Sequence, residues 1–131
     1  MKARMAGGAL VLAWTGFVVH NFADLPGQTF VSPETLLPSL GFVGIAVLWL
    51  TGAHRAAVWA ALVWGGLHLV GGAFLSVLPL PILPFDPEQS LRHYLFHVLY
   101  GVTQLPLLLV AWRSRRTDGL PDRPGVLNDR T

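Results

Sequence analysis

The amino-acid sequence predicts an all-α, polytopic membrane protein, a four-transmembrane-helix up-down bundle with both termini in the cytoplasm. Of the 131 residues, 53% are hydrophobic and only 12% are charged, whereas an average soluble domain has about 25% charged residues. Four apolar segments are each long enough to cross about 30 Å of hydrocarbon. The basic residues fall mainly on one side of these segments. We therefore assign residues 1–116 to one four-helix transmembrane domain.

The first predicted span covers residues 5–23 and follows Lys2 and Arg4. A basic start before an apolar run is also typical of a secretory signal peptide. The run is long, however, and no small-x-small cleavage site follows it, so we expect it to be retained as a helix. Residues 24–32 then form a loop, with Pro26 and Gly27 as a turn.

The second and third predicted spans cover residues 33–52 and 55–78. Ser32 occupies an N-cap position and Pro33 the first helical position of the second span. The turn between these spans is short, so they are antiparallel neighbours. Four glycines in the third span predict a face on which another helix packs closely.

The fourth predicted span covers residues 87–113. The preceding segment, residues 78–87, contains four prolines among apolar residues, which favours an extended segment at the membrane interface. Asp86 as N-cap, Pro87 at the first helical position and Gln89 two residues later are typical of a helix start. Residues 117–131 are polar and aperiodic, so we expect a disordered cytoplasmic tail.

Charge predicts the orientation of the bundle. One side of the predicted spans carries six basic residues: Lys2, Arg4, Arg55, Arg113, Arg115 and Arg116. The other side carries four acidic residues and one arginine: Asp24, Glu34, Asp86, Glu88 and Arg92. The positive-inside rule then places both termini in the cytoplasm. We expect a multi-pass protein of the inner or plasma membrane, with the lipid bilayer as its first partner.

Other partners are less constrained by the sequence. A bundle this small has a large lipid-facing area, which is compatible with a homo-oligomer or with membership of a larger membrane complex. The basic residues form no aromatic-interleaved patch, so no nucleic-acid partner is expected.

Polar residues form a stripe along the fourth span. His93, His97, Tyr100 and Gln104 recur at spacings of four, three and four, so they share one helical face. Such a face avoids lipid, because polar groups are costly in hydrocarbon. Counting about 1.5 Å per residue from the cytoplasmic arginines places His20 and His97 at one level of the outer half. The same counting places His68 and Tyr100 about one turn deeper.

The sequence thus predicts a histidine-lined polar site, which six residues would form: His20, His68, His93, His97, Tyr100 and Gln104. Three functions are compatible with it. Neutral imidazoles on facing helices bind haem iron, copper or zinc, and the candidate ligands are His20, His68, His93 and His97. Alternatively, the protein is an accessory subunit whose histidines only hydrogen-bond between helices. A third possibility is a transporter for protons or a small solute.

Several kinds of chemistry are excluded. The chain has no cysteine, which excludes thiolate sites and disulfides. No serine-hydrolase motif surrounds Ser76 or Ser90, and no glycine cluster fits a phosphate loop. No acidic residue lies in the apolar interior of a predicted span, because Glu34 and Glu88 fall in the first turns of theirs, so we expect no carboxylate beside the histidines. Whether the protein is an enzyme is left open.

Overall fold

The computed structural model describes residues 3–83 and 86–117, and it is entirely helical apart from turns and loops. Four described helices are long and apolar enough to cross a membrane, which confirms the predicted fold class at that level. Thr117, the first residue of the predicted tail, ends α4, and residues 118–131 lie outside the described residues. The helical elements, in order, are α1 Ala3–Asp24, α2 Pro33–Leu50, α3 His54–Leu67, η1 His68–Phe74, η2 Leu75–Val77 and α4 Leu91–Thr117.

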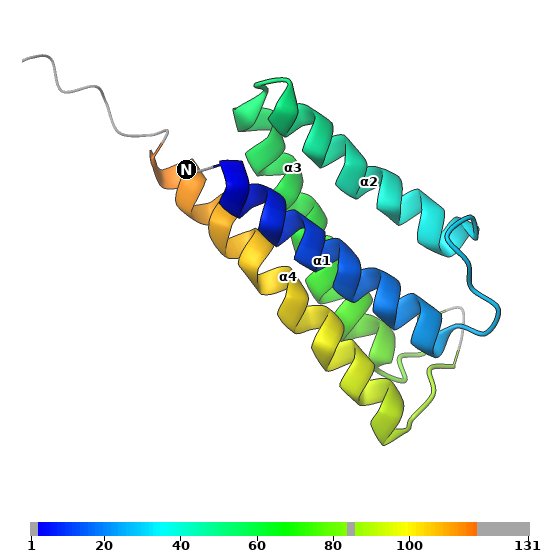
Figure 1. The fold of residues 1–131 in the computed structure, drawn as a ribbon. Coiled ribbons are helices and arrows are strands. Elements are labelled where there is room, and N and C mark those ends of the chain that lie inside the picture. Colours follow the sequence, from blue (N-terminus) through cyan, green and yellow to red (C-terminus); the bar gives the residue numbers. More distant parts are fainter. Residues whose placement is uncertain (1–2, 84–85, 118–131) are drawn as a thin grey trace, which may run out of the picture.

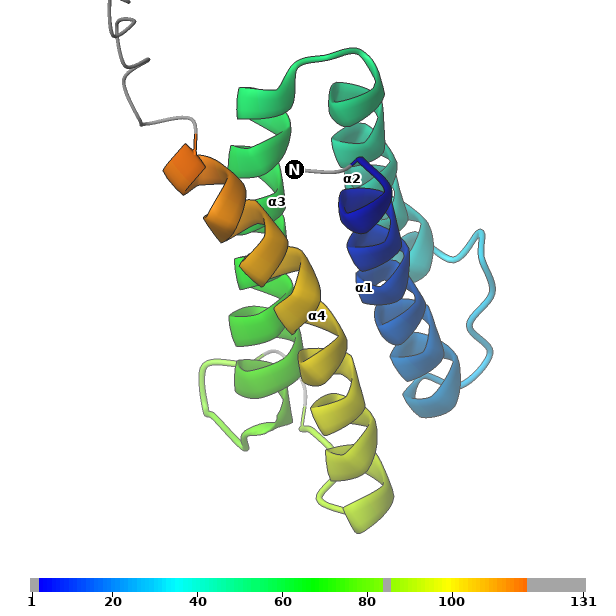
Figure 2. The same cartoon turned by 60° about the vertical axis from the view of Figure 1, so that its left-hand side comes forward.

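The four long helices run alternately up and down (Figure 1). α4 packs against α1 on one side and against α3 with η1 on the other, while α2 contacts α1 and α3. The start of α1, the α2–α3 turn and the end of α4 share one end of the bundle (Figures 1 and 2). We call this the arginine end, because Arg4, Arg55 and Arg113–Arg116 lie there. The α1–α2 loop and the segment before α4 lie at the other end, which we call the acidic end.

Small residues let the helices approach one another. Ala13, Ala57, Ala61 and Ala111 are completely buried, and larger buried side chains such as Phe42 and Leu107 pack with them in the core. Many large apolar side chains are instead exposed on the outside of the bundle. This distribution fits a protein whose surroundings are apolar, because there the close packing of small residues holds helices together.

The four glycines of the third helical run, which consists of α3, η1 and η2, divide into two groups. A Cβ at Gly65 would lie 3.1 Å from Leu108, and one at Gly72 would lie 2.7 Å from the Tyr100 hydroxyl oxygen. A Cβ at Gly66 or at Gly71 would meet no heavy atom of a neighbouring element within 4 Å among the described residues. The predicted packing face therefore exists, but only half of the four glycines form it.

The start of α4 differs from the prediction. The helix begins at Leu91, and Asp86 and Pro87 precede it in a non-helical segment. Ser90 is the residue that caps it, since its Oγ accepts a hydrogen bond from the His93 backbone N–H at 3.2 Å. The Gln89 amide instead donates to the Val77 carbonyl oxygen at 3.2 Å. Asp86 and Ser90 can both cap a helix. The contact of Gln89 with Val77, at the end of η2, favours the start at Ser90.

The third helical run also differs from a regular α-helix. After Leu67 it widens into a π-helical segment, η1, and then tightens into the short 3₁₀ segment η2. Such π segments are uncommon and often occur at functional sites. η1 begins at His68, one of the predicted site residues.

Candidate functional site

Two histidines and an aspartate meet where the end of α1 packs on the first turns of α4. His20 Nε2 lies 3.0 Å from His97 Nε2 and 3.4 Å from Asp24 Oδ2. One ligand atom from each of the three residues lies within 4.8 Å of the other two, in an arrangement that could hold a metal ion. We call His20, Asp24 and His97 the His/Asp cluster.

Close approach of α1 and α4 makes this contact possible. A Cβ at Gly16, one turn before His20, would lie 1.8 Å from Thr103 Oγ1 on α4. Real Cβ atoms do not come this close to another atom, so only glycine allows the helices this spacing. Gly16 therefore brings the two histidines within reach of each other.

The hydrogen bonds of Asn21 fix the proton of the His20 ring. The Asn21 amide nitrogen donates to the Glu34 carbonyl oxygen at 3.0 Å and to Thr35 Oγ1 at 3.2 Å. Thr35 in turn donates its hydroxyl proton to Gln28 Oε1 at 3.0 Å. Asn21 Oδ1 is then an acceptor, 3.3 Å from His20 Nδ1. His20 therefore carries its proton on Nδ1, and in the neutral ring Nε2 has a free lone pair.

His97 is held in the same tautomer by a backbone group. Its Nδ1 lies 3.1 Å from the carbonyl oxygen of Ala73, and a carbonyl can only accept. Ala73 lies in η1, near the end of the third helical run, where π- and 3₁₀-type geometry replaces the regular hydrogen-bond ladder. The neutral His97 ring therefore also has its lone pair on Nε2.

Two lone pairs thus face each other in the His/Asp cluster. Neutral His20 and His97 cannot hydrogen-bond through their Nε2 atoms, because both ring protons are used elsewhere. Their 3.0 Å contact requires a shared positive charge, either one extra proton or a metal ion. Orientation of a ligand histidine by an acceptor at its other nitrogen is also the usual outer-shell arrangement of metal sites.

Asp24 adds a negative charge to the same point. Its side chain is only 3% exposed, and Oδ2 has no hydrogen-bond donor among the described residues. The rings of His20 and His93 lie beside it but balance its charge only when they are protonated, and a buried carboxylate without a cation is costly. Asp24 is also the last residue of α1, where the helix dipole places partial negative charge. The electrostatics of the cluster therefore favour a cation.

His93 lies beside the cluster rather than within it. Its Nδ1 is 3.2 Å from Asp24 Oδ2, and its ring centroid is 4.3 Å from that of His97. The predicted one-face arrangement of His93 and His97 is therefore present. His93, however, faces the carboxylate, and His97 faces His20. His93 therefore helps to position the Asp24 carboxylate.

His68 and Tyr100 form a separate pair further along the bundle. The Tyr100 hydroxyl and His68 Nδ1 are hydrogen-bonded to each other. The His68 ring is enclosed by aromatic rings, with Phe42 and Trp64 centroids both at 4.9 Å. Tyr100 also contacts His20, with ring centroids 5.0 Å apart. The pair is thus adjacent to the cluster, and the His68 nitrogen that faces Tyr100 is already hydrogen-bonded.

Gln104 is not part of the histidine site. Its side chain is completely buried, and its amide nitrogen donates to the Ala13 carbonyl oxygen on α1 at 2.9 Å. Among the described contacts, none joins Gln104 to a histidine. Its role is a hydrogen bond between helices.

A cavity of about 590 Å³ connects the cluster with the acidic end of the bundle. His20, Asp24, His93, His97 and Tyr100 line its inner part. Three further carboxylates line it as well, those of Glu34, Asp86 and Glu88. This distribution of charge would attract cations to the cavity and repel anions.

The sequence did not reveal two residues of this site. Asp24 follows the apolar run by one residue and was expected in a loop, but α1 includes it. The prediction that no carboxylate accompanies the histidines is therefore wrong. The four-residue spacing of His20 and Asp24 was the available signal, since such residues share a helical face. Asn21 offered no signal, because its role depends on contacts with α2.

No family model, curated protein or solved structure matches this chain. The geometry of the site is therefore the basis for assigning a function.

Proposed function

We propose that this is a small integral membrane protein that binds one divalent transition-metal ion through His20, His97 and Asp24. Three ligand atoms that face each other, two of them imidazole nitrogens whose ring protons are donated elsewhere, support this proposal. Two imidazoles and one carboxylate form a donor set used by zinc. Bonds of about 2.0–2.1 Å at tetrahedral angles separate neighbouring ligand atoms by about 3.3 Å. The observed separations of 3.0 Å and 3.4 Å are close to that value.

The same geometry favours a bare ion over haem. Bis-histidine haem ligation needs a slot for the porphyrin between the two rings, yet His20 and His97 are in direct contact at 3.0 Å. Their ring planes also meet at 78° with centroids 4.3 Å apart. An ion needs only small side-chain movements, whereas a porphyrin would require α1 and α4 to separate.

The position of the site suggests exchange with water on one side. Three protein ligands leave a fourth coordination position, as in zinc sites that exchange water or substrate. Here that position would face the cavity lined by Asp86 and Glu88. With both termini in the cytoplasm, as the charge distribution predicts, the cavity opens on the outer face of the inner or plasma membrane. The protein would then take up its metal from that side.

The competing interpretation is that the histidines only join helices. It is favoured for the His68–Tyr100 pair and for Gln104, each of which makes a hydrogen bond between helices. For the His/Asp cluster it requires one extra proton shared by His20 and His97, with Asp24 as counterion. The two interpretations differ in whether a proton or a metal ion lies between His20 and His97. A measurement of metal binding distinguishes them.

Cobalt titration of the purified full-length protein in mild detergent tests the proposal. Co²⁺ substitutes for zinc, and its visible absorption bands report the coordination geometry. We expect one Co²⁺ per chain, displaced by Zn²⁺, in the wild type and in the control variant His54→Ala. His54 contacts Trp49 at the arginine end, away from the cluster. We expect no such bands in His97→Ala.

Two results would contradict metal binding. One is a wild-type protein without stoichiometric Co²⁺ or Zn²⁺ at neutral pH, which would assign the cluster to a shared proton. The other is equal binding in His97→Ala and wild type, which would place the metal elsewhere. Because His97→Ala removes a packed ring, its helical content is compared with that of wild type. His97→Gln, which retains much of the volume, provides a second variant.

A further inference from the structure

The arginine end of the bundle carries charge that no described carboxylate balances. Five arginines lie there: Arg4, Arg55, Arg113, Arg115 and Arg116. The described acidic residues lie at the opposite end. They occur at the end of α1, at the start of α2 and in the segment before α4. Among the described residues, the only ion pairs join Asp24 to histidines. These guanidinium groups are therefore available to an anion from outside the described chain.

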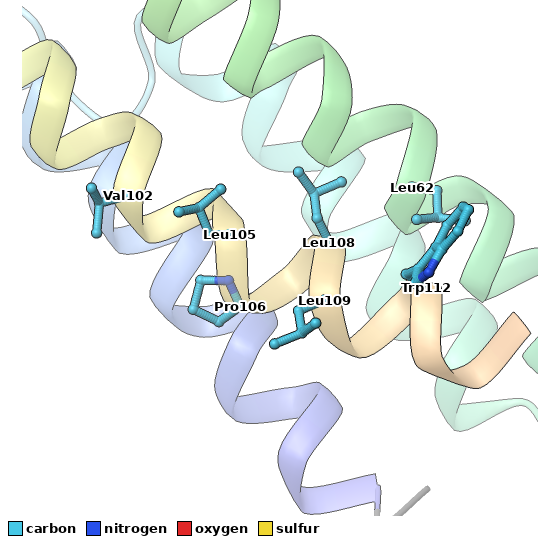
Figure 3. Close-up of a pocket in the computed structure, with 7 residues that line it drawn as sticks. All are labelled: Leu62, Val102, Leu105, Pro106, Leu108, Leu109 and Trp112. Carbon is cyan, nitrogen blue, oxygen red and sulfur yellow. The ribbon is translucent and has the colours of Figure 1, made fainter. Parts of the chain in front are cut away.

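A long apolar groove runs along α4 toward this end (Figure 3). Its volume is about 810 Å³. Seven apolar side chains line it: Leu62 from α3, and Val102, Leu105, Pro106, Leu108, Leu109 and Trp112 from α4. Figure 3 shows Leu62 and Trp112 together at one end, with the others spread back along α4. The groove lies within two spans, so its natural occupant is a hydrocarbon chain.

The two arginines nearest the end of the groove are held on tryptophan rings. The Arg115 guanidinium carbon lies 4.2 Å from the Trp112 ring centroid and 5.3 Å from that of Trp59. The Arg116 guanidinium carbon lies 5.4 Å from the Trp112 centroid. Stacking fixes the plane of a guanidinium and leaves its N–H edge free to bind phosphate in a bidentate manner. Trp112 therefore joins the apolar groove to two phosphate-binding groups.

We infer that this groove binds an anionic phospholipid, with an acyl chain along α4 and its phosphate at Arg115 and Arg116. The apolar lining and the adjacent positive charge match the two parts of such a lipid. Basic pockets between transmembrane helices are known binding sites for anionic headgroups. A second copy of the bundle fits less well. In a membrane both copies have the same orientation, so the two arginine clusters would face each other.

Fluorescence quenching by brominated lipids tests this inference. The full-length protein is reconstituted in phosphatidylcholine vesicles with increasing fractions of phosphatidylglycerol brominated on its acyl chains. The Trp112 contribution is the difference between wild type and Trp112→Phe. We expect phosphatidylglycerol to quench it at several-fold lower mole fraction than brominated phosphatidylcholine. Each arginine near the surface contributes about a fivefold preference.

Two variants separate the headgroup site from general surface charge. In Arg115→Gln/Arg116→Gln we expect the preference for the anionic lipid to disappear, whereas Arg4→Gln, at the same end on α1, retains it. All three arginines are exposed, and the helical content of each variant is compared with that of wild type. Equal quenching by both lipids in wild type would overturn the inference, as would an unchanged preference in the double variant. If neither lipid quenches Trp112, protein covers the groove and the lipid assignment is wrong.

Discussion

The His/Asp cluster and the His68–Tyr100 pair contain the same kind of side chain in the same bundle, yet they differ in hydrogen bonding. A phenol and an imidazole nitrogen form a hydrogen bond whichever one donates, so His68 Nδ1 has a partner in Tyr100. His20 and His97 have used their ring protons on Asn21 and Ala73. Their remaining nitrogens can only accept. The partner of a buried histidine, rather than its burial, therefore determines whether it can bind a cation.

The aromatic surroundings of the two sites reinforce this difference. Rings of Phe17, Phe42 and Trp64 enclose His68, which leaves no carboxylate among its described neighbours. The His/Asp cluster has Asp24 within it and faces a cavity lined by further carboxylates. Negative charge thus accompanies the site whose nitrogens are free.

Asp24→Asn should produce the largest change. Loss of a charged ligand should weaken Co²⁺ or Zn²⁺ binding by at least about a hundredfold, more than the loss of an outer-shell group. The metal-free protein should become more stable, because a buried charge that neutral histidines do not balance is removed and the new amide can donate to His20 Nε2. Metal titration and thermal unfolding of the metal-free protein measure the two effects.

Glu88→Gln is the matched control for Asp24→Asn, because Glu88 is exposed and lines the cavity outside the cluster. It should leave the affinity within about twofold, as expected for a screened surface charge. A metal-free Asp24→Asn protein that is less stable than wild type, with unchanged metal affinity, would assign Asp24 a structural role only.

Asn21→Leu should produce an intermediate change. The leucine removes the acceptor at His20 Nδ1, so the ring is free to rotate and to exchange tautomers. Such outer-shell losses typically weaken metal binding 10–100-fold, and the stoichiometry should stay at one. Isothermal titration with Zn²⁺ measures both quantities.

Asn21→Asp separates orientation from packing. The aspartate retains an acceptor for His20 Nδ1 but loses the donors to Glu34 and Thr35. We expect near wild-type metal affinity together with a lower free energy of unfolding. Equal affinities in Asn21→Leu and wild type would mean that Asn21 does not orient His20.

The helices were more predictable than the site because they depend on the summed hydrophobicity of many residues. Residues 5–23 suffice to predict the first span, and one residue more or less changes that sum little. The start of α4 was misplaced by four residues because Asp86 and Ser90 have similar cap chemistry. Only the contact of Gln89 with Val77 distinguishes them, and that contact is tertiary.

The site depends on helix rotation, which hydrophobicity does not specify well. Counting residues placed His20 and His97 at one level, and the structure brings their rings into contact. Helical spacing also grouped Gln104 with the histidines of the fourth span, although its hydrogen bond leads to Ala13. Asp24 was missed because its burial arises from His20 and His93 on two helices. The burial of a polar side chain in a membrane protein can be predicted only when its protein neighbours are known, because those neighbours replace contact with hydrocarbon.

Tyr100→Phe should produce the smallest change in metal binding and a clear change in stability. The phenylalanine retains the ring that contacts His20 but leaves His68 Nδ1 without its partner. Loss of one hydrogen bond between membrane helices costs about 0.6–2 kcal/mol, so we expect lower thermal stability and metal affinity within about twofold of wild type. Tyr94→Phe, whose hydroxyl is bonded to Gln89 in an exposed position, should have a smaller effect on stability. If Tyr100→Phe abolishes metal binding, the pair and the cluster form one site, and the distinction between satisfied and unsatisfied histidines does not hold.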